Sequence, residues 1–480
     1  MKAKLILIAL ISFALNLSRS YCQENQLLTS DEAYVIAKGH MALFSSADLE
    51  LLSPQEICDD LSHPLAWVFK LEPQGFIVVP ATQLVPKVIA YSFNNDFGDL
   101  NNQNPLLRIL RSDISQRIRY YKQTDDTKTQ ILNHHTRKIE NKDLKSHLLL
   151  DQWPATGDGW LTTNWTQTTP YNDLCPMDPV TLSRSYAGCP SVAMAMILNF
   201  HRETNGTHFD DSDDYYHNYA GRQYWIDDDY QQVDFASFTQ LNEYLDTLNA
   251  HWTKNQPLTS TDKASLTFAC GVACKQVYSS EGSGTFGVNQ ALDAYLRFGC
   301  TTAELLDESD PGMWDRLKQN IKDTLPAHLA VVDEAWQTGH NVVVDGYNTE
   351  DYYHINFGWG GPYNSWYLLP EEMPYNLTVV EGVVLDIMKD TTVNVKNYLL
   401  QTCKVYPNPS GLSTHFLFAN PGNVAHSIII YNTSGQVLET IDNIRGNEVI
   451  FTNTSRNSGL YFFRLQNNNG VITAGKFVIH

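Results

Sequence analysis

The sequence has few positive charges, few cysteines and little uninterrupted hydrophobicity. Its 480 residues carry 33 Lys and Arg against 53 Asp and Glu, which gives a formal net charge of −20. A protein that binds nucleic acid usually concentrates Lys and Arg in a basic patch. The sequence has no such patch, so nucleic acid is not expected as a partner. Hydrophobic residues make up 43% of the chain, enough for globular domains, and the length predicts two to four of them.

The longest apolar run lies at the N-terminus. Residues 5–17 (LILIALISFALNL) follow the basic start MKAK and precede small residues near Ser20. This order is typical of a secretory signal peptide, which we place at residues 1–22. A lipoprotein interpretation through Cys22 is weaker, because Arg-Ser-Tyr precedes that cysteine. No later segment has 18 consecutive apolar residues, so no transmembrane span is expected.

The eight cysteines are too scattered for a disulfide framework. Loss of the signal peptide leaves seven, and an odd number in an exported chain suggests a free, reactive thiol. Cys270 and Cys274 have no second pair at the spacing of a zinc site, so no structural metal is expected. Eight acidic residues between 202 and 232 would suit calcium. Their spacing matches no EF-hand, and a solvated loop is the favoured interpretation.

Changes in composition divide the chain into three folded regions and a linker. Residues 23–123 combine a helix pattern that opens near residue 29 with strand-like runs and a second helix pattern. Residues 124–147 are polar and almost without aromatics, as in a linker. Residues 148–389 are rich in Trp, Tyr and Gly. Residues 399–480 contain short strand-like runs separated by turn residues, which is typical of a small all-β sandwich.

The stretch AGCPSVAMAM places a cysteine at the start of a predicted helix. Pro190 suits the first helical position, and an apolar face follows at 3.6-residue spacing, so Cys189 is expected at the helix N-terminus. The helix dipole favours a thiolate there and lowers the thiol pKa. On this stretch alone, a packed core cysteine is an equally good interpretation.

A cysteine nucleophile needs a base, and two histidines compete for that role. His340 begins the strand-like run HNVVVDGY, and His354 lies in the next one, YYHINFGWGG, after a short hairpin loop. On adjacent antiparallel strands Asn356 is expected to face His340 and to orient its imidazole. His354 lies among aromatics in mid-strand, where a packed core histidine is the favoured interpretation.

Two further segments are candidates for the cleft. Gln167 lies 22 residues before Cys189, and its side-chain amide is expected to donate to an oxyanion together with the backbone N–H of Cys189. The loop EGSGTFG contains Ser283 and Gly284 and is expected to line the substrate cleft, because glycines permit close backbone approach. An ordinary glycine turn is an equally good interpretation of that loop.

Five motifs in order resemble the streptopain family of papain-like cysteine peptidases: NWTQTTPYNDLCP, AGCPSVAMAM, CGVACKQVYSSEGSGTFG, GHNVVVDGY and YYHINFGWGG. The resemblance covers most of residues 148–385. It implies Cys189 as the nucleophile and His340 as the general base. It further implies an oxyanion role for Gln167 and places two residues in the block that holds and shields the histidine, Asn356 and Trp359.

The sequence departs from the family pattern beside three of these positions. Pro190-Ser191 stand after the nucleophile, where the family usually has Val-Ala. Phe357 replaces the usual Trp and cannot donate an N–H. The loop DEAWQTG before His340 is bulkier than the glycine-rich loop of the family, which bears on substrate preference.

The flanking regions resemble known modules as well. Residues 23–123 resemble the inhibitory prodomain of the same family through GFIVVPATQLVPKVIAYS. Residues 399–480 resemble the C-terminal sorting domain of type IX secretion cargo through VYPNPSG and GKFVIH. These resemblances imply inhibition by the chain's own prodomain and activation by a cut between residues 124 and 150. They also imply export by the type IX secretion machinery, through the outer membrane of a Gram-negative bacterium to the surface or the medium.

The predicted fold class is α+β, with a papain-like catalytic domain preceded by an α+β prodomain and followed by a small all-β sandwich. The predicted function is that of a secreted cysteine endopeptidase, made as a zymogen, that hydrolyses protein or peptide substrates without a cofactor. Two alternatives stay open. One is a papain-fold amidase or transferase. The other is a catalytically dead, surface-displayed binding protein.

Overall fold

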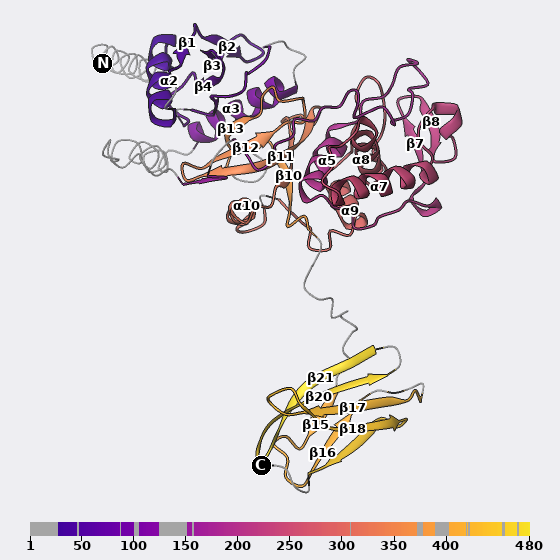
Figure 1. The fold of residues 1–480 in the computed structure, drawn as a ribbon. Coiled ribbons are helices and arrows are strands. Elements are labelled where there is room, and N and C mark those ends of the chain that lie inside the picture. Colours follow the sequence, from indigo (N-terminus) through magenta and orange to yellow (C-terminus); the bar gives the residue numbers. More distant parts are fainter. Residues whose placement is uncertain are drawn as a thin grey trace, which may run out of the picture. The chain divides into compact units, whose positions relative to one another are not determined.

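A computed structural model gives the structure of the protein. It describes residues 27–45, 48–86, 88–99, 105–123, 151–155, 158–307, 309–371, 378–388, 403–418, 420, 423–453, 457–467 and 470–480. The predicted signal peptide and the predicted linker at 124–147 lie outside these residues. The chain divides into two compact units, Met1–Lys389 and Asp390–His480. Figure 1 shows the helices and strands of both.

The first unit is organised on one antiparallel sheet, with twelve strands in its described part. The strand order is β1-β3-β4-β5-β13-β12-β11-β10-β14-β9, with β2 beside β3 and β6 beside β11. The strands are β1 (Glu50–Leu51), β2 (Gln55–Cys58), β3 (Pro64–Glu72), β4 (Phe76–Pro80), β5 (Ala90–Ser92), β6 (Gln152–Trp153), β9 (Glu304–Leu306), β10 (Ala327–Val332), β11 (Gly339–Asn348), β12 (Tyr352–Asn356), β13 (Ser365–Leu368) and β14 (Val380–Leu385).

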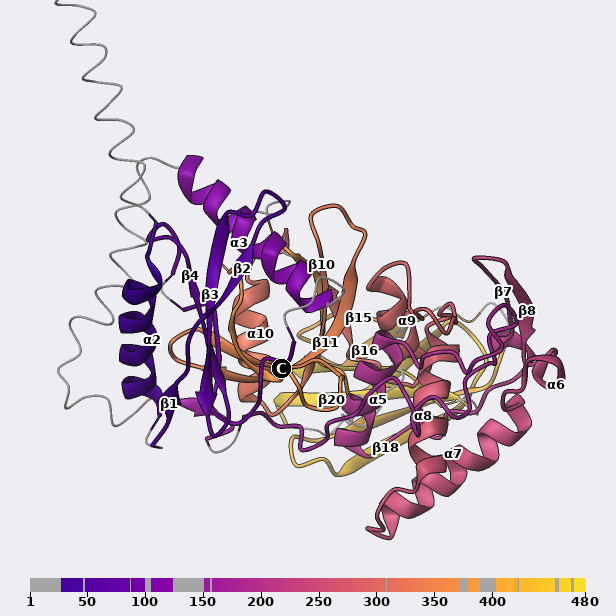
Figure 2. The ribbon, with the colours of Figure 1, turned by 90° about the horizontal axis from the view of Figure 1, so that it is seen from above.

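The N-terminal region places one helix on each face of this sheet. Helix α2 (Ser30–Phe44) begins where predicted, because Thr29 and Glu32 form a reciprocal capping box. Helix α3 (Pro105–Gln123) packs its apolar residues into a different core from that of α2. Figure 2 shows the strands β3 and β4 between the two helices.

The predicted prodomain and the predicted catalytic region share this sheet. Strand β5 pairs with β13, so that Tyr91 lies opposite Trp366. Helix α3 adds a polar contact, since Nη2 of the buried Arg117 donates to the carbonyl oxygen of Leu368 at 2.7 Å. The N-terminal region therefore forms part of the same packed unit as the strands that carry His340 and His354.

A helical layer packs against the β10–β11 part of the sheet. Its central helix is α5 (Cys189–His201), which contacts β11 and α8 (Ser260–Ala273). The periodicity predicted one apolar face on α5, but all residues from Pro190 to Leu198 are buried, because helices and sheet surround it. The other elements of this layer are α7 (Phe238–Thr253), α9 (Asn289–Arg297), the short α6 (Tyr230–Val233), the 3-10 helix η1 (Asp211–Asp213) and the hairpin β7 (Tyr215–Tyr219) with β8 (Arg222–Ile226). Helix α10 (Met313–Lys322) packs on the opposite face of the sheet, in the core that also contains α3.

The second unit consists of strands in its described part. One sheet has the order β15-β16-β19 and the other β18-β17-β20-β21, and aromatic and aliphatic side chains of both fill one core. The strands are β15 (Lys404–Tyr406), β16 (Ser413–Leu417), β17 (His426–Tyr431), β18 (Val437–Ile444), β19 (Glu448–Thr452), β20 (Gly459–Asn467) and β21 (Gly470–Ile479). Together with the mixed first unit, this confirms the predicted α+β class and the all-β C-terminal domain.

Candidate active site

Cys189 begins helix α5, as the sequence predicted. Gly188 precedes it with a φ of +87°, a conformation that favours glycine. A Cβ at Gly188 would also lie 2.5 Å from Oε1 of Gln276, whose Nε2 donates to the carbonyl oxygen of Ala187 at 2.7 Å. Pro190 follows in the first turn, where its missing N–H costs nothing. Gly188 and the buried Gln276 therefore fix the backbone immediately before Cys189.

The Cys189 thiol is half-buried and has an amide beside it. Nδ2 of Asn341 donates to Sγ over 3.9 Å. Burial raises the pKa of the thiol above its ordinary value, while N–H groups of Asn341 and of Cys189 itself act in the opposite direction. The N–H at the helix start thus acts in the expected direction, but the cost of desolvating a thiolate is larger, so the net shift of the thiol pKa is upward.

His340 lies at the start of β11 and is held by the turn that follows β12. Its imidazole stacks on Trp359, with ring centroids 4.3 Å apart. Nε2 donates to the carbonyl oxygen of Phe357 at 2.9 Å. Burial lowers the pKa of His340 to about 4, so the ring is neutral near pH 7. Since Nε2 carries the proton in this hydrogen bond, Nδ1 keeps its lone pair and has the character of a base.

Asn356 does not face His340, so the predicted pairing is wrong. In the antiparallel register Asn356 lies opposite Val343, whereas His340 lies opposite Val331 on the other side of β11. Asn356 Nδ2 donates to the carbonyl oxygen of Thr163 at 2.9 Å, and its Oδ1 accepts from the backbone N–H of Gly358 at 3.0 Å. Asn356 thus stabilises the turn whose next carbonyl, that of Phe357, orients the imidazole.

Gln167 lies beside the loop that carries the thiol. Its backbone carbonyl accepts from the N–H of Ala187 at 2.9 Å, two residues before Cys189. The side chain is half-buried, and its amide hydrogen-bonds to none of the described residues. An amide that no protein group occupies remains able to donate to a substrate oxygen.

The loop with Ser283 and Gly284 is hydrogen-bonded to the segment that precedes Cys189. Val277 and Gly284 exchange two backbone hydrogen bonds, and Ser283 Oγ accepts from the N–H of Ser279 at 3.0 Å. The carbonyl of Ser279 in turn accepts from the N–H of Tyr186, three residues before Cys189, at 3.1 Å. A Cβ at Gly284 would meet nothing within 4 Å, so this position faces open space.

The competing histidine, His354, and a second cysteine, Cys175, lie in other surroundings. His354 Nδ1 is 2.7 Å from Oδ1 of the buried Asp345, and its ring packs edge-on against Trp366. Cys175 is fully buried, and burial raises the pKa of its thiol. Neither side chain hydrogen-bonds to Cys189 or His340.

Asn341 is a site residue that the sequence analysis missed. It follows His340 directly on β11, and its side chain reaches Sγ of Cys189 at the start of α5. His328 was missed as well; its Nε2 lies 2.7 Å from Oδ1 of Asn341. A polar residue next to the predicted base was the available signal.

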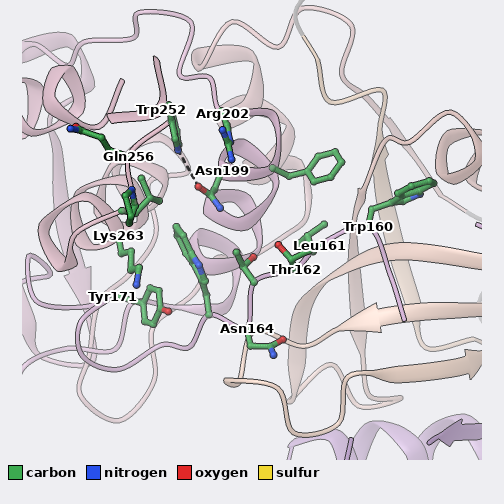
Figure 3. Close-up of a pocket in the computed structure, with 15 residues that line it drawn as sticks. Trp160, Leu161, Thr162, Asn164, Tyr171, Asn199, Arg202, Trp252, Gln256 and Lys263 are labelled. Atoms are coloured by element: carbon green, nitrogen blue, oxygen red, sulfur yellow. Dashed lines mark hydrogen bonds between the residues drawn. The ribbon is translucent and has the colours of Figure 1, made fainter. Parts of the chain in front are cut away.

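A separate cavity of about 680 Å³ lies at the other end of α5. Figure 3 shows Asn199 and Arg202 on one side of it and the extended segment with Leu161, Thr162 and Asn164 on the other. Asn199 is ten residues along the helix from Cys189, a distance of about 15 Å at the rise of an α-helix. The thiol does not line this cavity. Its wall continues into Thr163, the partner of Asn356.

No group of three or more His, Cys, Asp or Glu side chains among the described residues is placed to hold a metal ion. The acidic stretch at 202–232 makes protein contacts instead, such as the ion pair of Asp213 with Arg297 at 2.7 Å. None of the helices that the structure describes is long and apolar enough to cross a membrane.

The fold and this site define a class, the cysteine peptidases that are made with an inhibitory region. Comparison with known families agrees: residues 165–367 match the Peptidase C10 family, residues 13–118 match the Spi protease inhibitor, and residues 404–480 match the secretion system C-terminal sorting domain. The central region of the chain is therefore similar to the Peptidase C10 family. The sorting domain marks the chain for type IX secretion and export through the outer membrane.

Individual relatives are distant. The thiol protease/hemagglutinin PrtT of Porphyromonas gingivalis is 25% identical over 310 residues, 61% of this chain, and the match spans only 32% of that protein's length. Streptopain of Streptococcus pyogenes is 23% identical over 317 residues, 63% of this chain and 73% of that one. A solved fragment of prointerpain A from Prevotella intermedia has a TM-score of 0.48 and 21% identity, covering 71% of this chain and 99% of the fragment.

Proposed function

We propose that the protein is a cysteine endopeptidase made as a zymogen, with Cys189 as the nucleophile and His340 as the general base. The observation that carries the proposal is the state of His340. Its Nε2–H is engaged by the Phe357 carbonyl and its ring is stacked on Trp359, which leaves Nδ1 to take a proton. The neighbouring residue, Asn341, reaches Sγ, so the start of β11 lies at the thiol.

The reaction follows from these groups. His340 Nδ1 takes the thiol proton, and the Cys189 thiolate attacks the peptide carbonyl. The proton then passes to the leaving amine, the C–N bond breaks, and a thioester remains on Cys189. Water, deprotonated by His340, hydrolyses the thioester and regenerates the thiol. No step requires a metal or an organic cofactor.

Gln167 is assigned to the oxyanion that forms in both tetrahedral intermediates. Replacing Gln167 with alanine is expected to lower kcat by roughly 10²–10³-fold with little change in KM, because the amide acts mainly in the transition state. Steady-state kinetics on a fluorogenic peptide measure this. Gln240→Ala, an exposed amide on α7, is the matched control and should keep full activity. Equal kinetics of Gln167→Ala and the wild type would remove Gln167 from the mechanism.

The proposed zymogen inhibition rests on contacts between α3 and the segment before His340. Arg108 Nη2 lies 3.0 Å from Oδ2 of Asp333, and Arg119 binds the Glu334 carboxylate through both terminal nitrogens, at 2.5 and 3.1 Å. The backbone N–H of Glu334 also donates to Ser112 Oγ at 2.9 Å. These contacts support inhibition of the catalytic region by the N-terminal region, which holds the loop that leads into β11.

Reversing the charge of this contact is expected to shorten latency. In Arg108→Glu/Arg119→Glu two attractive pairs become repulsive, and the exposed pair Arg119–Glu334 alone is worth about 0.2–1 kcal/mol. The lag before peptidase activity develops in the purified full chain should fall roughly three- to tenfold. The same lag should shorten in 1 M salt, because salt screens exposed pairs.

The matched controls separate charge from folding. Adding Glu334→Arg to Arg119→Glu restores an attractive pair and should lengthen the lag again. Lys38→Glu, an exposed cation on α2, should leave the lag as in the wild type. A lag that stays constant in all charge-reversal variants would show that α3 does not restrain the loop.

A further inference from the structure

Two buried side chains, Tyr295 and His328, and the half-buried Asn341 lead from the helical core to the thiol. The hydroxyl of Tyr295 on α9 lies 3.0 Å from Nδ1 of His328 on β10. Nε2 of His328 lies 2.7 Å from Oδ1 of Asn341, and Nδ2 of Asn341 lies 3.9 Å from Sγ of Cys189. Tyr295 and His328 have no exposed surface. The chain of contacts uses none of the groups assigned above to the base or the oxyanion.

The direction of each hydrogen bond follows from the groups present. The carbonyl oxygen of Asn341 can only accept, so Nε2 of His328 carries the proton and donates to it. Burial lowers the pKa of His328 to about 4, so near pH 7 its other nitrogen, Nδ1, is unprotonated and accepts from the Tyr295 hydroxyl. With its oxygen engaged, Asn341 presents its NH₂ group to the sulfur. Each hydrogen bond of the series then has one donor and one acceptor, and the last donor is the N–H of Asn341 that points at Sγ.

We propose that Asn341 is a further catalytic residue, whose amide N–H stabilises the Cys189 thiolate, and that His328 and Tyr295 are the positioning residues that hold it. This rests on the proposed function, in which Cys189 is the nucleophile. Hydrogen bonds to a charged acceptor are stronger than those to a neutral one, so the amide favours the thiolate over the thiol. Such a donor offsets part of the cost of burying a charge at this site.

The arrangement leaves His340 free for proton transfer. His340 and Asn341 are neighbours at the start of β11, and His340 hydrogen-bonds to the carbonyl of Phe357 rather than to a member of the series. The titratable groups around the series are His340, which interacts with His328, Cys274, which interacts with Cys189 and Tyr295, and two further cysteines that interact with Tyr295, Cys270 and Cys300. No carboxylate among the described residues hydrogen-bonds to any member of the series.

The proposal is tested by the pH dependence of Cys189 alkylation in the full-length chain. Iodoacetamide labelling is followed for each cysteine separately by mass spectrometry of peptides. In Asn341→Ala the midpoint for Cys189 should move upward by about 1 to 2 pH units, the size expected for one hydrogen bond to a charged group. The half-buried Cys58 and Cys403 serve as internal references, and their midpoints should not move.

The positioning residues are tested by a rescue. His328→Gln keeps an N–H donor toward Asn341 Oδ1 and should retain a midpoint close to that of the wild type. His328→Leu lacks this donor and should shift the midpoint in the same direction as Asn341→Ala. Tyr295→Phe removes one hydroxyl and should cause a smaller shift. A role in folding alone predicts no difference between these variants once each is shown to be folded by circular dichroism.

The outcomes separate the proposal from the function it rests on. Asn249→Ala removes a comparable amide on α7, one that donates to Thr204 Oγ1, and should leave the midpoint unchanged. A midpoint in Asn341→Ala equal to that of the wild type, with peptidase activity present, overturns the role of Asn341 alone. A Cys189 that is inert at every pH in the wild type overturns both. If Asn341→Ala does not fold, the alkylation midpoints of Tyr295→Phe, His328→Gln and His328→Leu decide whether the series stabilises the thiolate.

Discussion

Cys189→Ala is expected to eliminate peptidase activity while leaving the fold unchanged. Removal of a nucleophile that acts as a unit with its base costs several orders of magnitude in kcat, about 10⁶-fold in well-studied serine enzymes. The protein should show no cleavage of casein and no labelling by a thiol-directed peptidyl electrophile at position 189. Since alanine is smaller than cysteine and the thiol is half-buried at the helix start, thermal unfolding should change little.

A second cysteine makes the control for this experiment. Cys175 is fully buried, and no described side chain donates a hydrogen bond to its sulfur. Cys175→Ala should therefore keep activity and labelling at Cys189, with a modest loss of stability from the small cavity. An active Cys189→Ala protein, or a folded but inactive Cys175→Ala protein, would contradict the assignment of the nucleophile. A folded wild-type protein that is neither labelled nor active after maturation would instead favour the catalytically dead binding protein.

The features that depend on neighbours in the sequence were predictable. The start of α5 follows from a proline in the first turn, and the start of α2 follows from the capping pair Thr29 and Glu32. The hairpin of β11 and β12 follows from two strand-like runs around a short polar loop. Each of these features is stabilised by contacts within a few residues, so local sequence is sufficient to indicate it.

The features that depend on packing were not predictable. The group that orients His340 is the backbone carbonyl of Phe357. Because every residue has a backbone carbonyl, the residue types do not indicate which one binds the histidine. The register that turns Asn356 away from His340 includes a β-bulge between Val344 and Gly346, which residue types do not reveal. The thiol pKa depends on how much of the protein covers Cys189. This burial of Cys189 results from the packing of the helices on the sheet, which the local sequence does not show.

His340→Ala should abolish activity nearly as completely as loss of the nucleophile, whereas His354→Ala should lower stability and leave catalysis intact. The prediction compares two histidines on neighbouring strands. Without His340, no group remains to take the thiol proton or to protonate the leaving amine, and kcat should fall by at least about 10⁴-fold. Alkylation of Cys189 should persist in this variant, because the thiol itself remains.

His354 has a partner that explains its place in the structure. Asp345 is fully buried, and its carboxylate accepts from the backbone N–H of Leu161 at 2.9 Å as well as contacting His354. His354→Ala removes one partner of a buried charged group, which costs about 1.5–3 kcal/mol. The melting temperature should fall by several degrees, while kcat/KM per folded molecule stays near that of the wild type. Loss of activity in a stable His354→Ala protein, together with an active His340→Ala protein, would transfer the role of the base to His354. The present geometry argues against this, because His354 Nδ1 is already directed at Asp345 and its ring lies against Trp366.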